Sequence, residues 1–391
     1  MKKYLQKNVW DAASERFDYI FTHFSRVCVS FSNGKDSGVL LNLAIEAARR
    51  HNRLPVNALY IDFEAQYKHA IDFTHRMFSR DEVTGWWVCL PIHLRNAVSQ
   101  ITPYWVCWDK DKRDAWVREY PDNPHVITDA GYFPFFRPGM EFEEFVPAFG
   151  EWFGRGEKTA ICIGIRSDES LNRFRTIASG SKVTLDGLQW TTKLHPRDEG
   201  SQVYNCYPIY DWRVEDVWTA NGRNGWDYNK IYDLMHMAGV PITKQRLCQP
   251  YGDDQRQGLH LFKALEPETW GKVVARVAGA NFGNRYTETG RAALGNGKVN
   301  LPPGYTCEAY AEFLLGTMLP QEAEYYRGKI KAFLQCCEDE GIATGAKSEV
   351  WRRITRTLLK NDRGCRGLSV SQLKRDTGRR EELTAMLQEQ L

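Results

Sequence analysis

A short polar segment between two apolar runs contains residue types that bind phosphate groups. Its members are Ser32, Asn33, Gly34, Lys35, Asp36, Ser37 and Gly38. The run 27–31 before it consists mainly of strand-forming residues, and apolar residues recur at helical spacing over 39–47 after it. A turn at Gly34 would expose backbone N–H groups at the start of a helix, where the helix dipole also attracts anions. Lys35 would add a full positive charge, so the segment is predicted to bind phosphate.

The alternative is an ordinary turn from a strand into a helix, in which Asp36 and Ser37 only cap the helix. The spacing differs from the Walker-type loop, in which the lysine follows Gly-x-x-x-x-Gly. The pattern Ser-x-Gly-Lys-Asp-Ser resembles instead the pyrophosphate loop (PP-loop) of the N-type ATP pyrophosphatases and of their relatives, the phosphoadenosine phosphosulfate (PAPS) reductases. Asn33 stands where these families usually have glycine, and asparagine tolerates the left-handed backbone that such a turn needs.

A second motif runs from Gly164 to Arg173, at the end of the strand-like run 159–165. It reads Gly-Ile-Arg-x-x-Glu-Ser-x-x-Arg and resembles the second signature of the PAPS reductase-like family. Guanidinium groups suit phosphate or sulfate oxygens, and cations at the start of a helix oppose its dipole unless an anion is present. Arg166 and Arg173 are therefore predicted to contact an anion. The alternative is a set of ion pairs with neighbouring carboxylates on a solvated face.

Two further segments extend this resemblance over nearly the whole chain. Residues 208–218 resemble the family's Pro-Ile-x-x-Trp-x-x-x-Asp-Val-Trp segment, which we interpret as a sign of fold rather than of chemistry. The C-terminal half resembles the uncharacterised C-terminal domain of one branch of the family, the branch that includes the bacterial immunoglobulin-binding regulator A.

The first part of the chain is predicted to have an α/β fold. Strand-like runs at 27–31, 56–61, 85–90, 159–165 and 203–209 alternate with helix-like runs. Alternation at this spacing implies a parallel sheet, in which ligands bind at the carboxyl ends of the strands. The resemblance implies that this sheet belongs to an adenine nucleotide α-hydrolase-like (PP-loop) domain.

We expect the domain boundary near residue 225, with the PP-loop domain at 1–225 and a mostly helical domain at 226–391. The aromatic-rich residues 91–140 are read as an insertion, either a lid over the site or a structural excursion with its own small core. Helices are expected at 228–238, 268–278, 306–317, 320–338, 347–360 and 369–389.

The resemblance also assigns roles to individual residues. The nucleotide would be bound by Ser32, Asn33, Gly34, Lys35, Asp36, Ser37, Asp62 and Gly164. The catalytic groups would be Lys35, Arg166 and Arg173, with the two arginines around the distal anionic group. Asp36 and Asp62 are the candidate ligands of Mg²⁺, which prefers hard oxygen donors.

Composition narrows the classes of partner. The 391 residues are 42% hydrophobic and 26% charged, as in a soluble globular protein. A net charge of +3 gives no support for broad nucleic-acid binding and none for membrane binding, although a local basic patch leaves nucleic acid open. An adenine nucleotide and a protein are the expected partners. Ten cysteines without an export signal indicate reduced thiols, and hence a cytoplasmic location.

Three functions remain open at this point. The first is an ATP pyrophosphatase or adenylyl transferase that activates a substrate, possibly for sulfur transfer. The second is a PAPS reductase, but its C-terminal Glu-Cys-Gly-x-His motif is absent and the last cysteine is Cys365, so Cys248 or Cys365 would have to replace it. The third is a regulatory nucleotide sensor. The pair Cys336-Cys337 lacks a downstream Cys-x-x-Cys, so ATP or PAPS is the expected cofactor and an iron–sulfur cluster is not expected.

Overall fold

The computed structural model of the protein describes residues 6–96, 99, 104–247, 259–277, 301, 304–316, 318, 320–345, 349–359, 365, 367–371 and 373–374. The chain forms two compact units, Met1–Ala280 and Asn281–Leu391. Each unit has its own hydrophobic core.

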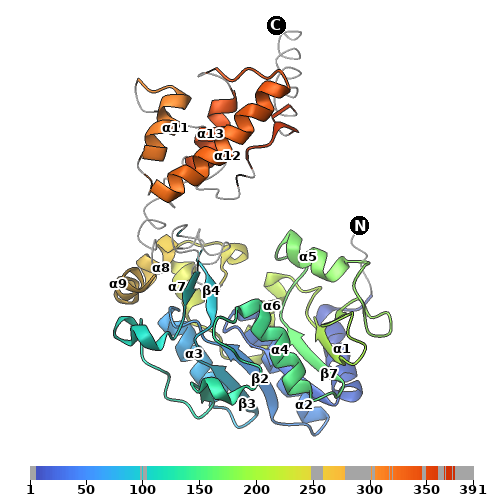
Figure 1. Ribbon diagram of the computed structural model, residues 1–391. Helices are drawn as coiled ribbons and strands as arrows, with labels where there is room; N and C mark the ends of the chain where they lie inside the picture. Colours follow the sequence, from blue (N-terminus) through green and yellow to red (C-terminus); the bar gives the residue numbers. More distant parts are fainter. Residues whose placement is uncertain are drawn as a thin grey trace. The chain divides into compact units, whose positions relative to one another are not determined.

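A mainly parallel seven-stranded sheet forms the centre of the first unit (Figure 1). The strands are β1 (Arg26–Ser30), β2 (Val56–Ile61), β3 (Val83–Val88), β6 (Val126–Ile127), β7 (Thr159–Ile163), β8 (Thr191–Lys193) and β9 (Val203–Cys206). Their order across the sheet is β6-β3-β2-β1-β7-β9-β8, and only β8 runs antiparallel to its neighbour. The predicted α/β class with a parallel sheet is therefore confirmed.

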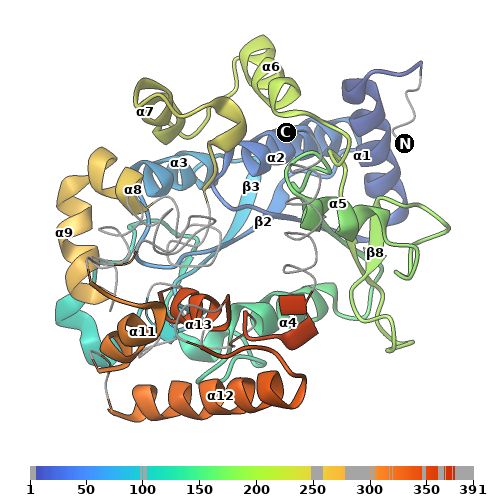
Figure 2. The same cartoon turned by 90° about the horizontal axis from the view of Figure 1, so that it is seen from above.

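Helices cover both faces of the sheet. The helices of this unit are α1 (Val9–His23), α2 (Lys35–Arg50), α3 (Lys68–Phe78), α4 (Phe142–Gly154), α5 (Leu171–Ala178), α6 (Val214–Asn224), α7 (Ile231–Met237), α8 (Leu259–Leu265) and α9 (Pro267–Arg276). Figure 2 shows α2 and α3 on one face and α4 on the other. Since α2 also packs against α1 and α6, most of its side chains are buried, and its first turn is held firmly at the carboxyl end of β1.

The described part of the aromatic-rich insertion is tied to the carboxyl end of β2. It contains the antiparallel pair β4 (His93–Arg95) and β5 (Tyr104–Val106), and it adds the edge strand β6 to the main sheet. Glu64, just after β2, is fully buried and accepts hydrogen bonds from the backbone N–H groups of Trp108 (2.7 Å) and Val117 (3.1 Å). The insertion thus shares the core of the sheet, and the lid role stays a prediction.

The boundary between the units lies after Ala280 rather than at the expected residue 225. Helices α7 to α9 place Ile231, Phe262 and Val273 in the core of the first unit. Arg276 of α9 donates from Nε to Glu64 Oε1 (2.9 Å) and from Nη2 to Glu64 Oε2 (3.0 Å), in a pair with almost no solvent exposure. The sequence analysis places residues 226–391 in the C-terminal domain, whereas α7 to α9 bury their apolar side chains in the first unit.

The regular elements that the structure describes in the second unit are helices. It contains α11 (Cys307–Gly316), α12 (Pro320–Asp339) and α13 (Glu349–Leu359), which pack around Ala311, Tyr326 and Ile354. The expected helical C-terminal region is confirmed over these elements, whereas most of the expected helix 369–389 falls outside the described residues.

In the part of the chain that the structure describes, none of the helices combines the length and the apolar character needed to cross a bilayer.

The buried Glu64–Arg276 ion pair is expected to contribute to the stability of the first unit by holding α9 against it. Replacing Arg276 with alanine would leave a buried carboxylate without its cation, which typically costs about 3–5 kcal/mol. We expect a loss of that size in the free energy of unfolding, measured by denaturant titration with tryptophan fluorescence. Arg223→Ala, which removes an exposed arginine on α6, is the control. Equal stability of the two variants would contradict the packing of α9 described above.

Candidate functional site

The turn between β1 and α2 has the backbone geometry that its sequence suggested. Asn33 adopts a left-handed conformation with φ of 51°, and Gly34 is the N-cap of α2. The Asn33 side-chain amide donates to the Tyr60 hydroxyl (2.7 Å) and to Gln66 Oε1 (3.1 Å). Asparagine is therefore accommodated at the position where the PP-loop pattern usually has glycine, because two side chains of neighbouring elements hold it.

The Ser37 hydroxyl forms hydrogen bonds within the turn, but several backbone N–H groups of the turn remain without an acceptor among the described residues. Ser37 Oγ accepts from the Ser32 N–H (3.1 Å) and donates to the Gly34 carbonyl (3.1 Å). Within the described residues, the backbone N–H groups of Asn33, Gly34, Asp36 and Ser37 have no acceptor in the protein. Clustered donors at a helix N-terminus favour an anion.

Three charged side chains meet at the first turn of α2. Asp36 Oδ2 lies 3.2 Å from Lys35 Nζ, and Asp36 Oδ1 accepts from Arg166 Nε at 2.6 Å. Lys35 and Arg166 are each only 4% exposed. Gly164 permits this approach, since a Cβ there would lie 3.2 Å from the backbone carbon of Asp36. The structure thus brings together four of the residues that the two sequence motifs singled out, from segments far apart in the chain.

Residues from the segment 229–245 also contact this turn, and sequence reasoning did not find them. The Lys35 N–H donates to the Tyr232 hydroxyl (3.1 Å), and Lys35 Nζ donates to the Gln245 carbonyl (2.9 Å). Asn229 Nδ2 donates to the Asn33 carbonyl (3.0 Å). The only available signal was the short connection from α6, which packs beside α2 and so keeps the following residues near the turn.

Asp62 lies apart from this cluster in a buried network of its own. It is 0% exposed; Oδ2 accepts from Trp87 Nε1 (2.7 Å), and Oδ1 accepts from the Glu64 N–H (2.9 Å) and from Arg118. Burial works to lower the pKa of Arg118, but the adjacent Asp62 carboxylate outweighs it and raises that pKa. Asp62 therefore fixes the insertion to β2, and no described contact joins it to Lys35 or Asp36.

Arg173 also lies outside the cluster. It is 43% exposed at the start of α5 and lies 3.7 Å from Glu169 through Nε, in the alternative arrangement that the sequence left open. Glu169 also accepts a hydrogen bond from Arg246 Nη2 (2.7 Å). Of the two arginines predicted to contact an anion, Arg166 is thus placed at the loop and Arg173 is held elsewhere by a carboxylate.

The two candidate carboxylates do not fit Mg²⁺ as they are placed. Both oxygens of Asp36 face cations, and both oxygens of Asp62 accept hydrogen bonds from protein donors. In the described part of the chain, no group of three or more His, Cys, Asp or Glu side chains is arranged to hold a metal ion. We therefore assign no protein-held Mg²⁺ to this turn.

The described cysteines of the first unit are poor candidates for a nucleophile. Burial raises the pKa of the Cys28, Cys89 and Cys206 thiols well above the usual range, and it raises that of Cys162 to about 12. In the second unit, Cys336 is exposed, whereas Cys337 and Cys365 are buried; Cys248 lies outside the described residues.

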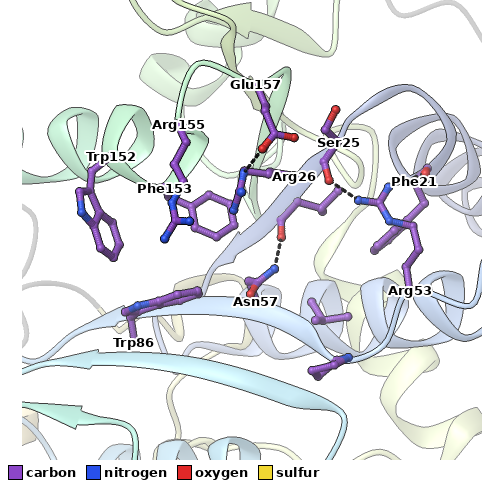
Figure 3. A pocket seen from close by; sticks show the side chains of 13 residues that line it. Phe21, Ser25, Arg26, Arg53, Asn57, Trp86, Trp152, Phe153, Arg155 and Glu157 are labelled. Carbon is purple, nitrogen blue, oxygen red and sulfur yellow. Dashed lines mark hydrogen bonds and ion pairs between the residues drawn. The ribbon is translucent and has the colours of Figure 1, made fainter.

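A cavity of about 320 Å³ opens at the other edge of the sheet, near the amino ends of β1 and β2 (Figure 3). Arg26 in its wall pairs with Glu157 (2.9 Å). Arg53 donates to the carbonyls of Phe21 (2.6 Å) and Ser25 (2.6 Å), where α1 ends. These arginines hold neighbouring segments together, so the cavity is separate from the loop in place and in chemistry.

Comparisons with known proteins show a relative that matches most of the chain. Residues 239–348 match the family model "Domain of unknown function (DUF3440)". The chain is 40% identical over 383 residues to the "Uncharacterized protein YbdN" of Escherichia coli (strain K12), covering 95% of this chain and 92% of the relative.

Two solved structures have similar arrangements at low identity. A PAPS reductase from Candida auris in a phosphate complex has 13% identity and a TM-score of 0.33, covering 60% of this chain and 93% of that one. An FMN adenylyltransferase from Candida glabrata in complex with ATP has 17% identity and a TM-score of 0.32, covering 59% and 62%.

The reactivity of the cysteine thiols should follow their burial in the structure. A thiolate is the reactive form, so a raised pKa keeps a thiol unreactive at about pH 8. We expect a chromogenic disulfide reagent to label Cys336 rapidly in the native protein, and the Cys336→Ser variant to lose one rapidly reacting equivalent. Cys28 and Cys162 should react only after denaturation, as peptide mapping would show; rapid labelling of either thiol in the native protein would contradict their burial.

Proposed function

The chain belongs to the same family as the Escherichia coli protein YbdN, and on that premise we propose that it is an enzyme that binds an adenine nucleotide at the turn 32–37. YbdN is described as an uncharacterized protein, so this relative suggests no activity for the chain. Support for the proposal comes from the residues of the turn and from the resemblance of both sequence motifs to the PP-loop family.

The observation that carries the proposal is the charge balance at the first turn of α2. Lys35 and Arg166 together carry two positive charges, and among the residues that the structure describes both form their ion pairs with the single carboxylate of Asp36. A buried charge without a counterion is costly, and an anion at the turn would supply the missing negative charge. The open N–H groups of Asn33, Gly34, Asp36 and Ser37 would donate to the same anion.

The place of the turn in the sheet also supports a nucleotide. It follows the carboxyl end of β1, the central strand, with β2 and β7 on either side. Ligands of open parallel sheets bind at this edge. A purine beside the strand ends and phosphates on the turn would match the PP-loop resemblance of residues 32–37.

We propose adenylyl transfer as the reaction. A substrate oxygen would attack the α-phosphorus of ATP, the bond from that phosphorus to the bridging oxygen would break, and pyrophosphate would leave with the electron pair. The proton of the attacking hydroxyl, where there is one, would pass to solvent. Lys35, Arg166 and the backbone N–H groups would stabilise the charge that develops on the leaving pyrophosphate.

Arg173 enters this proposal only through the motif resemblance. It would contact the distal anionic group if its side chain left Glu169, from which Nε is 3.7 Å away. Surface ion pairs of this kind are weak, with typical values of about 0–1 kcal/mol. No step is assigned to Asp62 or to a protein-held Mg²⁺.

PAPS reduction is the second enzymatic candidate and has less support. A cysteine thiolate would attack the sulfur of PAPS, the sulfur–oxygen bond to phosphate would break, and thioredoxin-type thiols would release sulfite from the thiosulfonate. The described thiols of the first unit are buried with raised pKa values. Release of sulfite from PAPS in the presence of thioredoxin would favour this candidate over adenylyl transfer.

A nucleotide sensor is the candidate from another class. The family model that matches residues 239–348 describes a domain of unknown function. In a sensor, this part of the chain would bind a protein or DNA partner. Tight nucleotide binding with no product, together with a partner that binds only in the presence of nucleotide, would favour this candidate.

The central prediction concerns the two cations. We expect Lys35→Ala and Arg166→Ala each to weaken ATP binding at least about tenfold, because each removes a charge-assisted contact worth about 1.5–3 kcal/mol. Isothermal titration calorimetry would measure the affinity, and a pyrophosphate release assay would follow turnover with candidate acceptors.

Lys230→Ala and Arg197→Ala, which remove exposed cations, are the matched controls. Thermal unfolding of all four variants separates lost binding from lost folding. ATP binding that is equal in Lys35→Ala and Lys230→Ala would refute the assignment of the phosphate site.

A further inference from the structure

Two oxygen atoms of the chain itself occupy donors of the proposed phosphate site. The Tyr232 hydroxyl accepts from the Lys35 N–H at 3.1 Å, and the Gln245 carbonyl accepts from Lys35 Nζ at 2.9 Å. One donor is a backbone N–H of the first turn of α2, and the other is the ammonium group of the loop lysine. Both are groups that an anion at this turn would use.

Both acceptors are held in place by their own surroundings. Tyr232 is 2% exposed, and its ring meets Trp218 edge to face at 5.5 Å between centroids. Its ring centroid also lies 5.3 Å from Lys35 Nζ. Gln245 is equally buried, and its side-chain amide donates to the Val240 carbonyl at 2.9 Å, which fixes the turn that presents its own carbonyl to Lys35.

The turn and this segment are also joined by Asn229. Its Nδ2 donates to the Asn33 carbonyl, and its Oδ1 accepts from the Ile231 N–H at the start of α7 (3.0 Å each). One side chain thus links the left-handed residue of the turn to the helix that carries Tyr232. The start of α7 is therefore joined to the turn by hydrogen bonds through a single side chain.

We propose that Tyr232 and Gln245 form an autoinhibitory latch, in which their oxygens hold Lys35 until a polyanion takes their place. This inference rests on the proposed function, because it concerns the same donors. A ligand must break both hydrogen bonds to use Lys35 fully, so the latch lowers the affinity of the turn for phosphate groups. A weakly charged ligand gains too little to open it, which favours polyphosphates over single monovalent anions.

The latch also connects the turn to the family-specific part of the sequence. Gln245 lies within the matched family domain, 239–348, although it packs in the first unit. Any event that shifts this segment changes the availability of Lys35. The family domain would thereby regulate the site through a backbone carbonyl.

Tyr232→Phe tests the latch because it removes one oxygen and keeps the ring. In the free variant the Lys35 N–H would have no hydroxyl acceptor, whereas a bound anion would satisfy it in both proteins. We expect calorimetry with inorganic pyrophosphate to show binding that is up to about tenfold tighter than in the wild type, equivalent to about 1.4 kcal/mol. Tyr228→Phe is the control, since its hydroxyl donates to Asp233 (2.9 Å) and does not touch the turn.

A purely structural role for Tyr232 would lower the affinity, so the sign of the change decides the matter. Unchanged or weaker pyrophosphate binding in Tyr232→Phe would overturn the latch. If Tyr232→Phe does not fold, Gln245→Ala serves instead. This variant removes the side-chain hydrogen bond to the Val240 carbonyl, which fixes the position of the residue 245 carbonyl, and tighter pyrophosphate binding is again expected.

Equal pyrophosphate affinities in Lys35→Ala and the wild type would overturn the proposed function and the latch together. Loss of binding in Lys35→Ala with no gain in Tyr232→Phe would overturn the latch alone.

Discussion

The chemistry proposed for this protein depends on two buried cations that share one carboxylate. Lys35 and Arg166 come from segments more than a hundred residues apart, and both buried side chains form ion pairs with Asp36. Such a cluster is stable only if its surroundings supply further negative charge or oxygen acceptors. The free chain supplies neutral oxygens from Tyr232 and Gln245, and a phosphate would supply charge. In the free chain these neutral oxygens accept hydrogen bonds from Lys35, and in the proposed complex a phosphate would replace them.

The sheet makes this cluster possible by bringing neighbouring strands to one edge. β1 and β7 are adjacent and parallel, so the residues after each strand meet at the first turn of α2. Gly164 allows the backbone after β7 to approach Asp36 within contact distance. Asp62 and Glu64 follow the end of β2 at the same edge of the sheet. Asp62 forms an ion pair with Arg118, and Glu64 forms one with Arg276. Carboxylates at equivalent strand ends thus have different roles, which their buried partners decide.

Local patterns were sufficient to predict the parts of the molecule that short segments determine. The strand–turn–helix around Gly34 and the parallel sheet follow from periodicity, and Asn33 in its left-handed conformation follows from residue type. Partners from distant segments could not be predicted in this way. Nothing in the sequence around Asp62 reveals its partner Arg118. The burial of α7 to α9 depends on tertiary contacts, so composition does not reveal that the first unit extends to Ala280. The Gln245 contact uses a backbone carbonyl, which leaves no trace in residue type.

The most direct test of the account is a crystal structure with a non-hydrolysable ATP analogue. We predict phosphate oxygens within hydrogen-bonding distance of the Asn33 and Gly34 N–H groups, and the Lys35 ammonium on a phosphate rather than on Gln245. An analogue bound elsewhere, for example in the cavity beside Arg26 at the opposite edge of the sheet, with Lys35 still on Gln245, would contradict it.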